Sequence, residues 1–152
     1  MLIRSRVLAM AALFGTASVA LAASAGDPKG APAPLCTPDE HTLCLDGGRF
    51  AVTAAYHLTP SGPDTEAHAI PVTDQTGDFW FFDPANVELI VKVLNGCSPP
   101  FNTYWVFAAG LTNVGVVITV VDLREQVTQR YTNEVGTAFL PIQDTSAFAT
   151  CP

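Results

Sequence analysis

The segment from Gly77 to Asn113 reads GDFWFFDPANVELIVKVLNGCSPPFNTYWVFAAGLTN and places two aromatic-rich apolar runs in less than a quarter of the chain. Aromatic and β-branched residues suit strands, because their side chains pack well on a pleated, half-buried surface. Turn-forming pairs interrupt the runs at Asp83-Pro84, Asn95-Gly96 and Pro99-Pro100, before any run is long enough for a helix. The segment therefore predicts several short β-strands joined by tight turns.

The clearest single strand lies upstream, from Arg49 to Leu58. Its apolar side chains share one face: Phe50, Val52, Ala54, Tyr56 and Leu58. Arg49, Thr53 and His57 point to the opposite face. Alternation with a period of two is typical of an antiparallel strand that has one face on the core and the other in water.

Other segments predict where strands lie within the sheets. Thr103 to Ala109 and Val114 to Val121 are apolar on both faces and are expected at the centre of a sheet, whereas Pro71 marks an edge strand. Glu88 and Lys92 are expected on the solvated side of their strand. About seven or eight short strands, without a long amphipathic helix, predict an antiparallel, immunoglobulin-like β-sandwich, with a closed β-barrel as the alternative.

The N-terminus has the features of an export signal. Arg4 and Arg6 precede an apolar run from Val7 to Phe14, and small residues offer A-x-A cleavage sites at 20–22 or 23–25. The run is shorter than the roughly 20 residues that span a bilayer. We predict a signal peptide over 1–25, a disordered Pro/Gly/Ala linker over 26–35 and a single domain over 36–152. A secreted, periplasmic or cell-envelope location follows.

All four cysteines lie beyond the predicted cleavage site, and an even number in an exported chain predicts two disulfides. Of the three connectivities, we favour Cys36 with Cys44 and Cys97 with Cys151. Zinc binding by the four cysteines is disfavoured, because no C-x-x-C pair is present and the spacings are irregular.

The acidic composition limits the classes of partner. The chain has 14 Asp and Glu against 7 Lys and Arg, a formal charge of −7, and loss of the signal peptide removes two of the basic residues. Such a balance argues against nucleic acid and anionic membrane surfaces as partners. We expect a monomer that is not inserted in the membrane after signal cleavage and whose partner is an extracellular protein or glycan.

No residue pattern predicts catalysis, a metal or a cofactor. His41, His57 and His68 are expected at the surface, although convergence of His57 and His68 would allow a weak metal site. No G-x-S-x-G motif is present, and the region from Asp74 to Asp83 lacks the EF-hand pattern of a calcium loop. The site predictions are therefore no catalytic residue, no metal ligand and no cofactor.

The aromatic residues are the remaining candidates for a binding site. Because neighbours on a strand point to opposite faces, Trp80 and Phe82 cannot share a face with Phe79 and Phe81. Either loops cover both faces, or the outer pair forms an exposed aromatic platform. The candidate binding residues on such a platform are Trp80, Phe82, Tyr104 and Trp105.

Six stretches carry a resemblance to other proteins: CLDGGRF, GDFWFFDPANVELIVKVLNGC, YWVFAAGLTNV, TVVD, YTNEVGTAF and PIQDTSAFATCP. They resemble an uncharacterised family of exported bacterial modules over about Cys36 to Pro152. The family's modules occur alone behind a signal peptide or at the C-terminus of larger secreted proteins, without an assigned activity. The resemblance implies an extracytoplasmic accessory domain and supplies no catalytic residue. This chain has Leu123-Arg124-Glu125 where a Gly-containing hairpin turn is usual.

Together these observations favour a non-enzymatic, extracytoplasmic accessory module with a structural or ligand-binding role. The alternative is a secreted inhibitor of a protease or other hydrolase, which would insert a rigid loop into its target's cleft. The loops Thr59 to Thr65 and Ser98 to Asn102 are the candidates for that role.

Overall fold

A computed structural model describes residues 35–152 of the chain. The predicted signal peptide over 1–25 lies outside the described residues, as does the predicted linker over 26–35 except for Leu35. Within the described part, no helix is long and apolar enough to cross a membrane.

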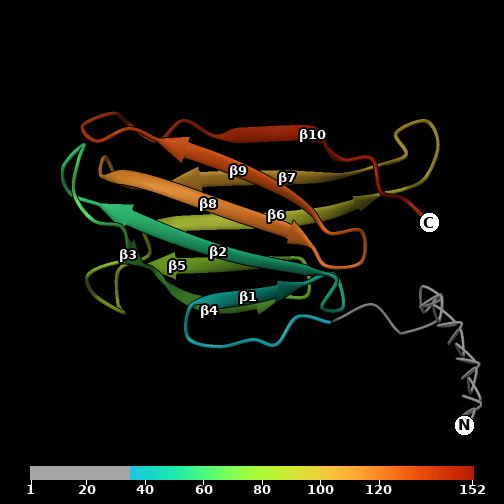
Figure 1. The fold of residues 1–152 in the computed structure, drawn as a ribbon, viewed down its shortest axis with the longest axis horizontal. Helices are drawn as coiled ribbons and strands as arrows, with labels where there is room; N and C mark the ends of the chain where they lie inside the picture. The colour runs from blue at the N-terminus through green and yellow to red at the C-terminus, as the bar shows by residue number, and fades with distance from the viewer. Residues whose placement is uncertain (1–34) are drawn as a thin grey trace, which may run out of the picture. The chain divides into compact units, whose positions relative to one another are not determined.

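Ten strands form two antiparallel sheets that pack face to face (Figure 1). Sheet A contains β1 (Thr42–Leu45), β2 (Phe50–His57), β3 (Thr65–Glu66), β8 (Gly115–Asp122) and β9 (Val127–Asn133). Sheet B contains β4 (His68–Thr73), β5 (Thr76–Trp80), β6 (Leu89–Gly96), β7 (Thr103–Gly110) and β10 (Ile142–Phe148). The order is β1-β2-β8-β9 in sheet A, with β3 also beside β2, and β10-β7-β6-β5-β4 in sheet B. The predicted β-sandwich is confirmed, and the sheets do not close into a barrel.

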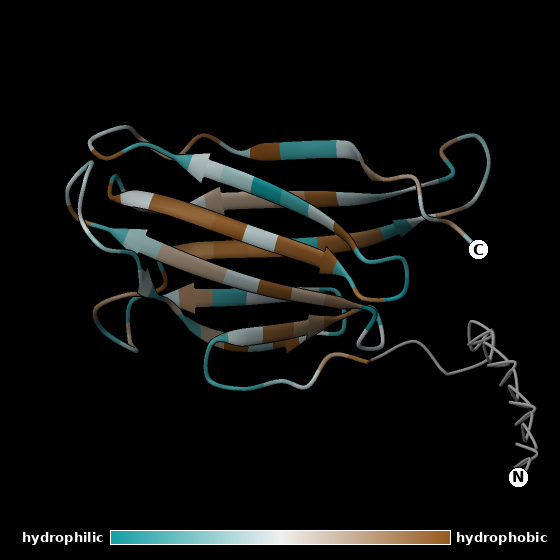
Figure 2. Cartoon of the chain, in the orientation of Figure 1, coloured by the Kyte–Doolittle hydropathy of each residue, from teal (hydrophilic) through white to brown (hydrophobic). Residues whose placement is uncertain are grey.

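The core lies between the sheets and follows the predicted alternation. Along β2, Phe50, Val52 and Ala54 are buried, and along β6 the inward residues are Leu89 and Val91, together with Val93. The central strand β8 is apolar over most of its length, whereas the edge strand β9 is mainly hydrophilic (Figure 2). The strand β8 is flanked by strands on both sides, and Val116, Ile118 and Val120 are buried between the sheets, which accounts for its apolar sequence.

The chain changes sheets between β3 and β4, at the edge where β1 and β4 lie close together. The backbone N–H of Ala67 donates to Ala54 O of sheet A at 2.9 Å, and the next residue, His68, pairs with Trp80 of sheet B. The strand β4 is the last of sheet B and contains Pro71, as expected for an edge strand.

Both predicted disulfides are confirmed. Cys36–Cys44 joins the segment before β1 to β1 itself, and Cys97–Cys151 joins the end of β6 to the C-terminal segment. They fasten the beginning and the end of the described chain to the sandwich.

Three side chains are not where the alternation places them. Leu58 is 62% exposed, because β2 ends at His57. His57 lies over Gly115 and is only 16% exposed instead of fully solvated. Glu88 is buried rather than solvated: it precedes β6, and its carboxylate turns inward to accept the Phe81 N–H at 2.7 Å.

Candidate functional site

An aromatic band lies on the outer face of sheet B and consists of Phe101, Trp105 and Phe107. Trp105 and Phe107 are half-buried and point away from the core, because the residues that alternate with them along β7 are buried. Their ring centroids are 6.1 Å apart, and the rings are inclined by 27°. Phe101 is 58% exposed and meets Trp105 edge to face at 5.0 Å. Trp105 and Phe107 are carried by β7 and are therefore held rigidly, whereas Phe101 lies in the turn before that strand.

Polar and aliphatic side chains border the aromatic band. Lys92 and Gln143 flank Phe107 on the neighbouring strands β6 and β10, and Ile90 lies next along β6. These residues, with Pro141 and Ile142, line a shallow hollow of about 180 Å³. The band thus combines ring faces with hydrogen-bonding groups at its margin, an arrangement that suits a ligand with an apolar face and a polar edge.

The four predicted binding residues occupy different places. Trp105 belongs to the aromatic band. Trp80 lies on the same face of sheet B, at the far end of β5, and stacks on His68 with ring centroids 3.8 Å apart. Phe82 is 55% exposed in the turn after β5. Tyr104 is 3% exposed in the core, where its hydroxyl accepts a hydrogen bond from Arg49, so it cannot line an exposed platform.

A second apolar surface lies at the loop end of the sandwich. The loop from Thr59 to Thr65 and the ring of Phe82 enclose a pocket of about 410 Å³, which Tyr56 and Leu58 also line. Asp64 holds the loop through its carboxylate, 3.0 Å from Nδ1 of His57. The loop is therefore tied to the end of β2.

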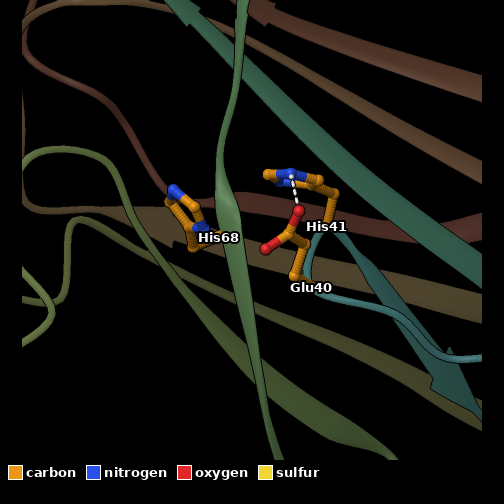
Figure 3. A group of neighbouring side chains, drawn as sticks. All are labelled: Glu40, His41 and His68. Carbon is orange, nitrogen blue, oxygen red and sulfur yellow. Dashed lines mark ion pairs between the residues drawn. The ribbon is translucent and has the colours of Figure 1, made fainter.

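A cluster of Glu40, His41 and His68 lies at the edge where the sheets meet (Figure 3). Each residue offers one ligand atom, and these atoms lie within 4.8 Å of one another. His41 Nε2 is 3.2 Å from Glu40 Oε1, the contact drawn as a dashed line in Figure 3. The two imidazole rings have centroids 4.9 Å apart. Two imidazoles and one carboxylate form the protein ligands of some zinc sites.

The hydrogen bonding of His41 fixes its tautomer. Nδ1 lies 2.9 Å from the Ala67 carbonyl oxygen, which can only accept, so Nδ1 carries the proton. In the neutral ring, Nε2 then presents its lone pair toward Glu40. The hydrogen bond to Ala67 raises the pKa of His41, burial lowers it in part, and the charges of Glu40 and Glu66 raise it further.

The cluster could not be predicted from the sequence because His68 is distant in the chain from Glu40 and His41. The pairing considered from sequence was His57 with His68, whereas the structure places His57 beside Asp64 and His68 beside His41. The only sequence signal is the adjacency of Glu40 and His41, which by itself is too common to indicate a site. The change of sheets between β3 and β4 brings His68 to them.

A buried network of charged and polar groups lies where β2 begins, at the end of that strand opposite to the loop from Thr59 to Thr65. The Arg49 guanidinium contacts Asp122 through Nε and Nη2, with a shortest distance of 2.6 Å, and the two side chains are 7% and 0% exposed. Nη1 donates to the Tyr104 hydroxyl at 2.7 Å, and Thr150 contributes its carbonyl to Arg49 and its hydroxyl to Asp122, both at 2.6 Å. Every member is paired within the network, which is therefore structural.

This network predicts loss of stability in acid. Burial alone would raise the pKa of Asp122, but hydrogen bonds from Arg49 and Thr150, with the Arg49 charge, outweigh it and lower the pKa below 3.8. A carboxylate with a lowered pKa in the folded state stabilises the protein above its unfolded pKa, and this contribution is lost as the pH falls through the folded pKa. The difference in unfolding free energy between wild type and Asp122→Asn, measured by urea unfolding, should therefore be largest near neutral pH, begin to narrow below about pH 4 and go on narrowing as the pH falls further. A gap that stays constant down to pH 2 would contradict the assignment.

Comparisons with known proteins do not indicate a family or a function for this chain. No family model matches the chain, and no curated protein or solved structure is significantly similar to it. The resemblance to exported bacterial modules stays a prediction. What the protein does is therefore inferred from the geometry of the described residues.

Proposed function

We propose that this protein is an extracytoplasmic, non-enzymatic accessory module that binds glycans through the aromatic band. Export is supported by the predicted signal peptide and by two disulfides, which form and persist in oxidising compartments. The non-enzymatic role is supported by the lack of a catalytic motif in the sequence.

One observation carries the choice of ligand: Phe101, Trp105 and Phe107 form a continuous aromatic surface with polar groups at its edge. Sugar rings have apolar C–H faces and polar hydroxyl rims, so they match ring faces bordered by hydrogen-bonding groups. Lys92 and Gln143 supply such groups next to Phe107, and Thr103 lies beside Trp105, accepting its Nε1–H at 3.1 Å.

The aromatic band predicts the effect of removing its rings. Trp105→Ala and Phe107→Ala should each weaken binding to the polysaccharide that wild type retains by about 5-fold, because each removes a stacking surface worth about 1 kcal/mol. Affinity electrophoresis against a panel of soluble cell-wall and plant polysaccharides identifies the ligand, and calorimetry with its oligosaccharides measures the dissociation constants.

Phe82→Ala is the matched control, since it removes an exposed aromatic ring outside the band. It should bind glycans as wild type does. Circular dichroism and the melting temperature establish that each variant is folded. Failure of wild type to bind any polysaccharide, or equal losses in Phe82→Ala and Trp105→Ala, would overturn the proposal.

The ordered loop from Thr59 to Thr65 favours a second candidate function, inhibition of a secreted hydrolase. The loop from Thr59 to Thr65 is tied back by the contact of Asp64 with His57, and Leu58 and Phe82 are exposed beside it. A pre-ordered loop loses less entropy on entering a cleft. For this function, Leu58→Ala and Phe82→Ala should relieve inhibition of a target hydrolase, whereas Trp105→Ala should not. The same three variants therefore separate the two candidates.

A further inference from the structure

We propose that Glu40, His41 and His68 form a binding site for one Zn²⁺ ion, or for another divalent transition-metal ion that prefers imidazole ligands. Nothing in the proposed glycan-binding function requires this site, which lies at the β1 and β4 edge. The site is built from two imidazoles and one carboxylate, the His₂Glu donor set that zinc accepts in proteins.

The separation of His41 Nε2 from Glu40 Oε1 fits two ligands of one metal ion. Because Nδ1 of His41 donates to the Ala67 carbonyl, Nε2 of the neutral ring presents a lone pair to a carboxylate oxygen 3.2 Å away. Two acceptors at this distance repel each other unless a proton or a metal ion lies between them. Metal–ligand distances of about 2.0–2.1 Å place neighbouring ligands of a tetrahedral site about 3.3 Å apart, close to the observed separation.

The surroundings hold both histidines in position. The Ala67 carbonyl orients His41 from the side away from Glu40, as outer partners of metal-bound histidines commonly do. His68 stacks on Trp80 with ring centroids 3.8 Å apart and an inclination of 9°, which fixes the plane of its imidazole. The Glu40 side chain is 76% exposed, so it is free to adjust to an ion held by the two histidines.

The location predicts what the metal would do. Glu40 and His41 lead into β1 of sheet A, and His68 begins β4 of sheet B, so an ion bound by all three would cross-link the two sheets. The segments already touch through the N–H of Ala69, which donates to Glu40 O at 2.9 Å. Since the unfolded chain does not hold these residues together, metal binding should stabilise the folded state. The exposed side of the site leaves room for a water ligand.

Thermal unfolding tests the site with the full mature chain. After chelator treatment and removal of the chelator, Zn²⁺ at about 100 times its dissociation constant should raise the melting temperature by on the order of 10 °C. Calorimetry should give one ion per chain. Glu40→Gln, His41→Gln and His68→Gln should each weaken Zn²⁺ binding by at least about 10-fold.

His57→Gln is the matched control, because it removes a histidine that contacts a carboxylate outside the cluster. It should keep the full response to Zn²⁺. A wild-type protein without a Zn²⁺-dependent shift, or a folded His68→Gln variant that retains it, would overturn the proposal.

A spectroscopic readout locates the ion independently of stability. Cu²⁺, which binds such donors at least as tightly as Zn²⁺, should quench Trp80, because that indole stacks directly on His68. The chain has two tryptophans, so quenching should persist in Trp105→Phe and be lost in Trp80→Phe. Zn²⁺ should prevent the quenching by competition. Equal quenching in both variants would show that Cu²⁺ binds elsewhere and would contradict the site.

Discussion

Replacing Arg49 with methionine is expected to lower the free energy of unfolding by about 3–5 kcal/mol. The substitution keeps most of the side-chain volume but leaves Asp122, which is 0% exposed, as a buried carboxylate without its cation. The Tyr104 hydroxyl and the Thr150 carbonyl lose a donor in the same step. Urea unfolding at neutral pH, followed by circular dichroism, measures the loss.

Two further variants separate the buried charge from a general effect of losing an arginine. Arg124→Met removes an exposed arginine two residues from Asp122 and should change stability by less than about 0.5 kcal/mol. Arg49→Met combined with Asp122→Leu removes both charges and should recover much of the loss, because no unpaired ion remains buried. A double variant as unstable as Arg49→Met alone would show that shape, not charge, dominates at this site.

The strands could be predicted because their causes are local. The alternation from Phe50 to Tyr56 defined β2, and the turn at Asp83 formed as expected, with the Asn86 N–H donating to Asp83 O at 2.9 Å. Apolar residues on both faces correctly placed β7 and β8 within the sheets. The disulfides also followed from sequence, since an exported chain with four cysteines offers few pairings.

The charged residues could not be placed in this way, because their partners are far apart in the chain. Arg49 and Asp122 are 73 positions apart, and each is unremarkable in its own segment. The hydrophilicity of Glu88 predicted a solvated position, yet its carboxylate accepts the buried N–H of Phe81 in the connection between β5 and β6. The pairing of distant strands decides these contacts. A short stretch of one sequence does not show which strands will pair.

The contrast between local patterns and distant contacts also explains which parts of the candidate sites could be predicted. Alternation along β7 turns Trp105 outward and its neighbour Tyr104 inward, so the predicted platform could not contain both residues. The cluster of Glu40, His41 and His68 depends on the crossing from sheet A to sheet B. Its two histidines meet only because β1 and β4 lie at the same edge.

Removing the Cys97–Cys151 disulfide by replacing both cysteines with serine is expected to lower the free energy of unfolding by about 4 kcal/mol. The bond closes a long loop, with a sequence separation of 54, and so restricts the unfolded chain strongly. Cys36–Cys44 has a separation of 8, and its removal should cost about 2.5 kcal/mol. Chemical unfolding of the two double-serine variants measures this ranking, and equal costs would contradict the loop-entropy explanation.

The long disulfide should also be coupled energetically to the buried network. Thr150, next to Cys151, gives its carbonyl to Arg49 and its hydroxyl to Asp122, so the bond holds the segment that completes the pairing of both ions. Without the bond, fraying of the C-terminus would expose the network, and Arg49→Met would then cost less than in the intact protein. A double-mutant cycle should show a coupling of about 1 kcal/mol or more between Arg49 and the Cys97–Cys151 pair, and none with Cys36–Cys44. Strict additivity of Arg49 with both disulfides would mean that the strands alone hold Thr150 in place.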